Sequence, residues 1–222
     1  DIRCDHSDIY FVLNAGWIIL MARDPQSAYD MNFAAVRIGE HPDVRLPVIV
    51  AYDGFLTSHQ KRRIERFDDP EAVKAFVGER KDPYTALDPD RPVTFGPYMN
   101  DPDLINNKVQ QHEAMEAARR VIPEVFGEFY EFSGRDYRTV DAYRMDDADA
   151  ALVLLNSAAE NAKEVVDRLR EEGHKVGIVS PNVLRPFPTD EIRRVFKNVR
   201  AAVVGDRGDS YGAEGGNLSL EV

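Results

Sequence analysis

Continuous apolar runs and a stretch of helical spacing alternate in the first quarter of the chain. Residues 16–22 and 46–52 are almost entirely apolar, which is typical of strands buried on both faces. Between them, Asp24 and Pro25 form the start signal of a helix, an N-cap followed by proline at the first helical position, and Gly39 is a stop signal. Because two buried strands joined by one helix pair in parallel with a right-handed crossover, the pattern predicts a strand–helix–strand unit.

The alternation of apolar runs and helical spacing is less regular over residues 66–134, and we expect these residues to form a connecting segment. Asp69-Pro70 begins a short helix, and the Pro- and Asp-rich residues 82–103 predict a long surface crossing. Since this crossing is too long for an ordered free loop, we expect a partner chain or a second copy to cover it. A helix follows, with apolar residues at helical spacing over 118–129, and Pro123 inside it predicts a kink or a break.

Strand and helix signals return in the last segment. Strands are predicted at 151–155, 176–180, 201–204 and 218–222, and helices at 158–172 and 189–196. The fold class is therefore α/β with a parallel sheet, organised as segments 1–65, 66–134 and 135–222.

Composition and charge restrict the function. The chain has 222 residues, 43% of them hydrophobic, and 28 Lys and Arg against 39 Asp and Glu, a net charge of −11. That apolar content excludes disorder, and the acidic balance argues against a nucleic-acid partner. The longest apolar run, over 11–22, falls short of the roughly 20 residues that a membrane span needs. We expect a cytoplasmic protein.

The single cysteine, Cys4, decides two further points. An internal disulfide is impossible, and an iron–sulfur cluster needs about four thiolates, so any electrons must leave through another polypeptide. The five histidines lack metal-site spacing, and we predict no metal site within this chain. The chain begins at Asp1 without methionine, and we expect a fragment or one portion of a larger subunit.

Three places are candidates for chemistry. Arg3, Asp5, His6 and Asp8 fall within six residues and alternate with apolar side chains, so we expect partial burial rather than a solvated turn. Asp53-Gly54 follows the second predicted strand, where open parallel sheets bind ligands, although a simple turn is the commoner use of this pair; His59 lies in the same loop. The Gly-rich stretch 205–216 lacks a phosphate-loop pattern, and we interpret it as a strand connection.

Five stretches resemble one enzyme family. Residues 5–10, 14–17, 47–59, 88–93 and 183–188, including the sequence Asp-Gly-Phe-Leu-Thr-Ser-His, resemble the thiamine-diphosphate-dependent 2-oxoacid:ferredoxin oxidoreductases. The resemblance implies the back part of the pyrimidine-side domain over 1–65, and a truncated transketolase C-terminal-like domain over 135–222. It also implies thiamine diphosphate and Mg shared with a partner chain, through Asp53, Gly54 and His59.

The resemblance further implies an alpha subunit with several partners. These are other subunits of beta and gamma/delta type, which would hold four-iron, four-sulfur clusters, together with ferredoxin and a small carboxylate substrate. The family's activating glutamate precedes Asp1 in the usual order and is not in this chain.

One departure from the family bears on the substrate. Pyruvate enzymes of the family carry a carboxylate-binding arginine at the position of Leu13, so we expect an oxalate-oxidising member. In this hypothesis Arg3, Leu13 and Phe11 contact the substrate, while Asp5 and Asp8 are catalytic. Pyruvate, or another 2-oxoacid, is the alternative substrate. A non-catalytic, flavodoxin-like binding module is the alternative from another class of protein.

Overall fold

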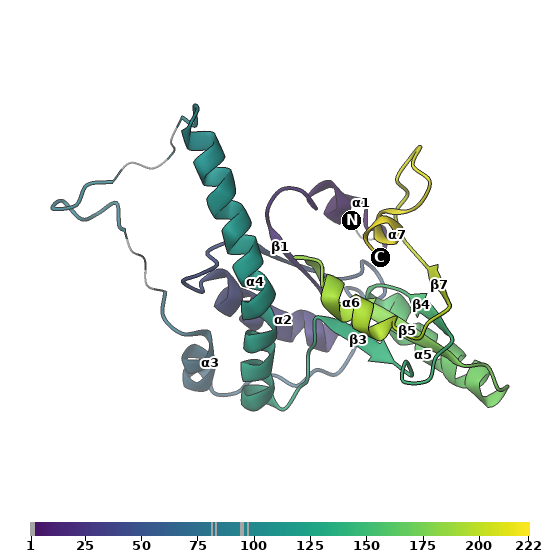
Figure 1. Ribbon diagram of the computed structural model, residues 1–222. Coiled ribbons are helices and arrows are strands. Elements are labelled where there is room, and N and C mark those ends of the chain that lie inside the picture. The colour runs from purple at the N-terminus through teal and green to yellow at the C-terminus, as the bar shows by residue number, and fades with distance from the viewer. Residues whose placement is uncertain (1–2, 81, 83, 94–95, 97) are drawn as a thin grey trace.

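The computed structural model describes residues 3–80, 82, 84–93, 96 and 98–222. The helices are α1 (Ser7–Phe11), α2 (Pro25–Gly39), α3 (Pro70–Val77), α4 (Asp103–Ser133), α5 (Asn156–Glu171), α6 (Thr189–Val195) and α7 (Asn217–Glu221). The strands are β1 (Ile18–Met21), β2 (Val48–Ala51), β3 (Val140–Tyr143), β4 (Ala150–Val153), β5 (Val176–Pro181), β6 (Val183–Arg185) and β7 (Ala201–Val204) (Figure 1). This confirms the α/β class.

The first sheet has the order β2-β1-β6. Strands β1 and β2 are parallel and are joined through α2, which confirms the predicted unit. Asp24 caps α2 as expected, since its side chain accepts a hydrogen bond from the backbone N–H of Ser27. Strand β6 pairs antiparallel with β1 although it comes from the last segment of the chain. The first and third predicted segments therefore share one sheet.

The second sheet has the order β3-β5-β4-β7. Strands β4, β5 and β7 are parallel to one another, and β3 runs antiparallel to β5 at one edge. The sequence pattern located the three parallel strands and missed β3 and β6, which are only four and three residues long. Asp141 interrupts the apolar run in β3 and Arg185 ends β6, so neither strand shows a continuous apolar pattern.

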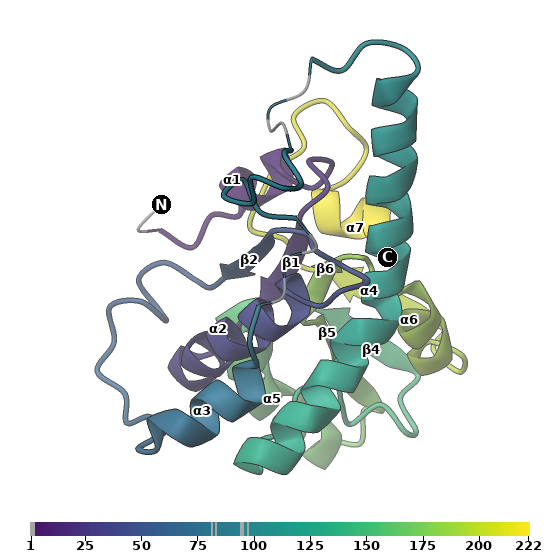
Figure 2. The same ribbon diagram turned by 90° about the vertical axis from the view of Figure 1, so that its left-hand side faces the viewer.

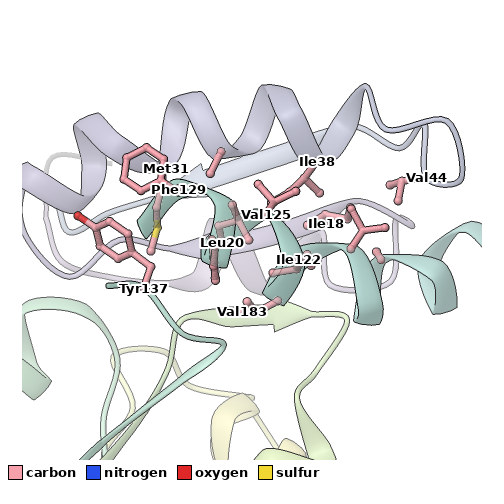
Figure 3. Packing of buried hydrophobic residues seen from close by; sticks show 14 of the residues in the cluster. Ile18, Leu20, Met31, Ile38, Val44, Ile122, Val125, Phe129, Tyr137 and Val183 are labelled. Atoms are coloured by element: carbon pink, nitrogen blue, oxygen red, sulfur yellow. The ribbon is translucent and has the colours of Figure 1, made fainter. Parts of the chain in front are cut away.

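Helix α4 joins the two halves of the molecule. Ile122 and Phe129 of this helix pack with Met31 and Ile38 of α2 and with Leu20 of β1 in one apolar cluster (Figure 3). The helix passes unbroken through Pro123, so the predicted break is wrong. Proline in a helix interior costs about 3 kcal/mol. Burial of apolar side chains offsets that cost, at roughly 1.5–3 kcal/mol each; the buried side chains beside Pro123 are Val121, Ile122, Val125 and Phe126.

A buried carboxylate fixes the exit from α4. Asp30 of α2 has no exposed surface and accepts hydrogen bonds from Arg135 Nε at 2.6 Å, Arg135 Nη2 at 2.9 Å and Tyr137 Oη at 2.6 Å. Burial is the main reason why the pKa of Tyr137 lies above its ordinary value. This cluster holds the residues that lead from α4 into β3 against α2.

The predicted strand over 218–222 is wrong, because Asn217–Glu221 forms the short helix α7. Asp206 Oδ2 accepts a hydrogen bond from the backbone N–H of Leu218 at 2.8 Å, and Glu221 pairs with Arg185 Nη2 at 2.7 Å. Leu218 is buried against the second apolar cluster. Asp206 thus accepts a hydrogen bond from one of the free backbone N–H groups in the first turn of α7, where the N-cap residue Gly216 has no side chain to do so.

The described residues between α3 and α4 form neither helix nor strand, as expected for a crossing. They extend away from the body of the molecule and rise to the first turn of α4, which projects beyond the sheets (Figure 1). Among the helices of the described part, none is long and apolar enough to cross a membrane.

Candidate active site

A cleft of about 470 Å³ opens at the carboxyl ends of the parallel strands β1 and β2. The segment before and within α1 forms one wall, residues 49–54 and 58–59 form another, and Asn156 at the start of α5 lies between them. Open parallel sheets bind ligands at this edge. The cleft thus occupies the position that the sequence predicted for a ligand.

Asp53 is the buried centre of this region. It is 1% exposed, and its Oδ1 lies 2.8 Å from Arg207 Nη1 and 3.4 Å from His6 Nε2. Its Oδ2 accepts a hydrogen bond of 2.8 Å from the backbone N–H of Ser157. Burial raises the pKa of Asp53, but the hydrogen bonds from His6 and Ser157 and the charge of Arg207 outweigh it and leave the pKa below its ordinary value. One carboxylate therefore joins three segments that are distant in the sequence.

Helix α1 is also attached to the Gly-rich loop before α7 (Figure 1). The backbone N–H of His6 donates to the Arg207 carbonyl at 3.1 Å, and the Tyr10 hydroxyl donates to Asp206 Oδ1. Burial is the main cause that raises the pKa of Tyr10 above its ordinary value, and the bond to Asp206 adds to it. The stretch 205–216 is thus a structural support for α1.

Three of the predicted charged residues line the cleft. Arg3, Asp5 and Asp8 are all exposed there, on the wall formed by the opening segment. Asp5 accepts hydrogen bonds from the hydroxyl and the backbone N–H of Ser7, which lower the pKa of Asp5. The structure brings one cation and two carboxylates to the mouth of the same cleft, and His6 is the buried member of the group.

Phe11 and Leu13 do not line the cleft, and their contact with a substrate stays a prediction. Phe11 is 88% exposed at the end of α1, and Leu13 is 8% exposed within the second apolar cluster. The backbone of Leu13 is held as well, because its carbonyl accepts a hydrogen bond from Arg185 Nε at 3.0 Å. An apolar side chain at this position packs into the core rather than facing the polar cleft.

The residues predicted to bind cofactor lie side by side in the structure, but they differ in accessibility. All of Asp53, Gly54 and His59 line the cleft. The Asp53 carboxylate is buried and contacts His6, Ser157 and Arg207. The Gly54 carbonyl accepts a hydrogen bond from Cys4 Sγ at 2.8 Å. The His59 ring is exposed, stacks on Phe55 at a centroid distance of 5.5 Å, and offers the side chain most accessible to a ligand.

Asn156 is a buried polar lining residue that the sequence analysis missed. It is 1% exposed and has a φ of 51°, in the left-handed region that non-glycine residues rarely adopt. Its Nδ2 donates to the Ala22 carbonyl at 2.5 Å, while its Oδ1 has no hydrogen-bond partner among the described residues. Its position in the sequence could have indicated a site, because Asn156 is a polar residue that directly follows the apolar residues 150–155.

The lining of the cleft suits the ring of thiamine diphosphate. The described residues contain no group of three His, Cys, Asp or Glu side chains that could hold a metal ion by themselves. The cleft has apolar walls from Ile9, Met21 and Ile49 and an unpartnered amide oxygen on Asn156, a combination that suits a nitrogen-containing aromatic ring.

Two family models match the chain. Residues 1–127 match the family described as pyruvate flavodoxin/ferredoxin oxidoreductase, thiamine diphosphate-binding, and residues 148–222 match the pyruvate:ferredoxin oxidoreductase core domain II. A solved 2-oxoglutarate:ferredoxin oxidoreductase from Magnetococcus marinus superposes with a TM-score of 0.54 over 85% of this chain and 34% of that one, at 17% identity. This last comparison supports the fold alone.

Curated relatives agree with these matches. The chain is 46% identical to pyruvate synthase subunit PorA of Thermotoga maritima over 96% of its own length and 54% of the relative's. It is 36% identical to the PorA subunit of Methanocaldococcus jannaschii, over 98% of this chain and 56% of the relative. It is 34% identical to the alpha subunit of NADH-dependent phenylglyoxylate dehydrogenase of Aromatoleum evansii, over 91% of this chain and 50% of the relative.

The chain spans about half the length of these relatives, and the matches extend over both of its sheets. It therefore belongs to the family of thiamine-diphosphate-dependent 2-oxoacid:ferredoxin oxidoreductases and corresponds to part of their alpha-type subunit.

Proposed function

We propose that this chain is part of the alpha subunit of an enzyme that oxidatively decarboxylates pyruvate. Carbon dioxide leaves the 2-oxoacid, two electrons pass through clusters in partner chains to ferredoxin, and the acyl group that remains is transferred to a nucleophilic acceptor such as a thiol. The observation that carries this proposal is the 46% identity to a pyruvate synthase subunit over 96% of the chain.

Thiamine diphosphate, when bound, supplies the electron sink for this chemistry. The part left to this chain is to position the substrate and to set the charge around it. Arg3 lies on the cleft wall, and its planar guanidinium suits a substrate carboxylate. Asp5 and Asp8 on the same wall would raise the energy of a bound carboxylate more than that of neutral carbon dioxide, which favours decarboxylation.

The substrate's side chain is the less constrained part of the proposal. Relatives at 46% and 34% identity are named for pyruvate and for phenylglyoxylate. Pyruvate carries a methyl group at the position where phenylglyoxylate carries a phenyl group. Oxalate remains the second candidate because Leu13 stands where pyruvate enzymes of the family carry an arginine. A dianion without a side chain would depend on other cations, and Arg3 is the one on the cleft wall.

A substrate screen of the complete complex tests both candidates. Reduction of a low-potential dye would be followed with pyruvate, oxalate, glyoxylate, phenylglyoxylate and 2-oxoglutarate, with thiamine diphosphate and Mg supplied. We expect the highest kcat/KM with pyruvate; preference for oxalate would reverse the order of the two candidates. Absence of bound thiamine together with a flavin absorption spectrum would refute the enzyme and favour a flavodoxin-like module.

A further inference from the structure

A second concave site lies beside the candidate active site, on the outer side of the loop that follows β2. Three segments line a pocket of about 290 Å³: residues 23–26 at the start of α2, residues 56–63 of the connection from β2 to α3, and residues 157–161 at the start of α5. Figure 2 shows that connection as a long excursion between the two elements. We call this site the arginine pocket, because Arg23, Arg62 and Arg63 line it.

The connection carries an excess of positive charge in an acidic chain. Lys61, Arg62, Arg63 and Arg66 lie within six residues and are exposed, against the single carboxylate of Glu65. Glu65 lies 3.5 Å from Arg135 instead. Within the part of the chain that the structure describes, none of these four cations has a carboxylate within ion-pair distance. A protein of net charge −11 thus leaves this cluster uncompensated by its own side chains.

The two carboxylates in the pocket are already paired. Glu160 lies 2.7 Å from Lys163 Nζ and 3.7 Å from Arg23 Nε. Asp24 accepts the hydrogen bond that caps α2. Their repulsion on an incoming anion is therefore reduced. Among the described residues, no carboxylate lies within ion-pair distance of Arg62 or Arg63, and Arg62 Nε donates to the neutral Gln60 Oε1 at 3.1 Å.

Ser157, one of the residues that line the pocket, has a buried hydroxyl without a partner among the described residues. Ser157 is 8% exposed, and its Oγ makes no hydrogen bond with any described residue. Ser157 belongs to the first turn of α5, a helix of 16 residues whose dipole favours negative charge at this end. Buried hydroxyls are normally hydrogen-bonded, so an unused donor beside two unpaired arginines indicates a missing acceptor.

We propose that the arginine pocket binds a phosphorylated ligand, with Arg62 and Arg63 contacting the phosphate oxygens and the Ser157 hydroxyl donating to one of them. Arginine's planar fork matches phosphate geometry, and serine supplies the additional donor. An acidic protein surface fits less well, because it would contact the whole stretch 61–66 evenly. The concave site involves only part of that stretch: Lys61 and Arg66 do not line it.

Binding of inorganic phosphate, inorganic pyrophosphate and adenosine 5′-diphosphate to the complete complex tests this inference. Thiamine diphosphate and Mg would be kept saturating, so that the cofactor site does not contribute, and the heat of binding would be measured by titration calorimetry. Comparison of the three probes distinguishes a free anion site from one that also takes a nucleoside. The double variant Arg62→Gln/Arg63→Gln is compared with Lys61→Gln/Arg66→Gln, which removes the same charge from the same segment outside the pocket.

We expect saturable binding that the Arg62/Arg63 variant weakens about tenfold or more, while the Lys61/Arg66 variant changes it less than about twofold. Ser157→Ala should weaken binding about threefold and leave the unfolding temperature unchanged, since its backbone bond to Asp53 is retained. Equal weakening by the two double variants would overturn the site in favour of general charge attraction. So would absence of binding by all three probes, or tighter binding of polyglutamate, which would indicate an acidic protein partner instead.

None of these outcomes depends on the oxidation of a 2-oxoacid. The calorimetry therefore tests the arginine pocket independently of the substrate screen, which tests the proposed function.

Discussion

Replacing Asp53 with asparagine tests whether this residue organises the structure or binds the cofactor. Oδ1 of the carboxylate forms an ion pair with Arg207 and a hydrogen bond with His6, and Oδ2 accepts a hydrogen bond from the Ser157 backbone. An asparagine of the same size has one accepting oxygen and one donating nitrogen. One set of donors must then face another donor, and the buried side of Arg207 loses its counter-charge.

The magnitude follows from burial. Asp53 is 1% exposed, so the lost contacts are not replaced by water. Removing one partner of a buried ion pair costs about 3–5 kcal/mol, a large share of the roughly 5–15 kcal/mol that stabilises a typical domain. For a chain of this size that corresponds to a fall of about 6–20 °C in the unfolding temperature.

Urea unfolding at neutral pH, followed by circular dichroism, measures the change. Asp146→Asn is the matched control, because Asp146 is exposed on the connection from β3 to β4; it should change stability by less than about 0.5 kcal/mol. A loss below about 1 kcal/mol for Asp53→Asn, with weaker binding of thiamine diphosphate, would refute the structural role and restore the cofactor role.

The pH dependence gives a second check on Asp53. Because its pKa in the folded protein is below the ordinary value, the stabilisation is fully present above the unfolded pKa of about 3.9 and disappears as the pH falls through the folded value. The stability difference between wild type and Asp53→Asn should therefore be constant at neutral pH and shrink below about pH 4. A difference that instead grows on acidification contradicts this argument.

Four further substitutions have expected outcomes. Tyr10→Phe removes the hydroxyl that donates to Asp206 and should cost about 1–3 kcal/mol in thermal unfolding; an unchanged Tm contradicts the contact. Phe129→Ala leaves a cavity in the first apolar cluster and should cost about 3–5 kcal/mol in urea unfolding, unless the cluster is loosely packed. Arg3→Met should remove about 2–4 kcal/mol of transition-state stabilisation and so lower kcat/KM for the 2-oxoacid. Unchanged turnover excludes Arg3 as the residue that binds the substrate carboxylate. Asp5→Asn should lower kcat more than it changes KM, and the reverse split indicates a role in binding alone.

Local patterns in the sequence determined the elements that depend on near neighbours. The apolar run before Asp24-Pro25 gave β1 and the start of α2, because capping and burial on both faces are decided within a few residues. Asp69-Pro70 located α3 for the same reason. The single cysteine and the charge balance excluded whole classes of function without any structure.

Where a side chain points was decided by tertiary packing. Leu13 stands where the family resemblance suggested a substrate contact, yet its side chain lies in the core. Phe11, two residues earlier, faces solvent. Sequence position located both near the cleft, but Phe11 is the last residue of α1 and Leu13 lies in the turn after it, and the direction of each side chain depends on what packs against it.

Pairing across long sequence separations was the other part that only the tertiary structure decided. Strand β6 joins the first sheet beside β1, and Asp53 collects donors from His6, Ser157 and Arg207, which lie in three different segments. These contacts form only when the tertiary fold brings distant segments together, and the spacing of residues within one segment does not specify them. The sequence alone therefore determined the strands and helices with clear local signals, such as β1, α2 and α3, and predicted which edge of the first sheet carries the cleft. Folding of distant segments decided that Asp53 is a buried support and not an open carboxylate.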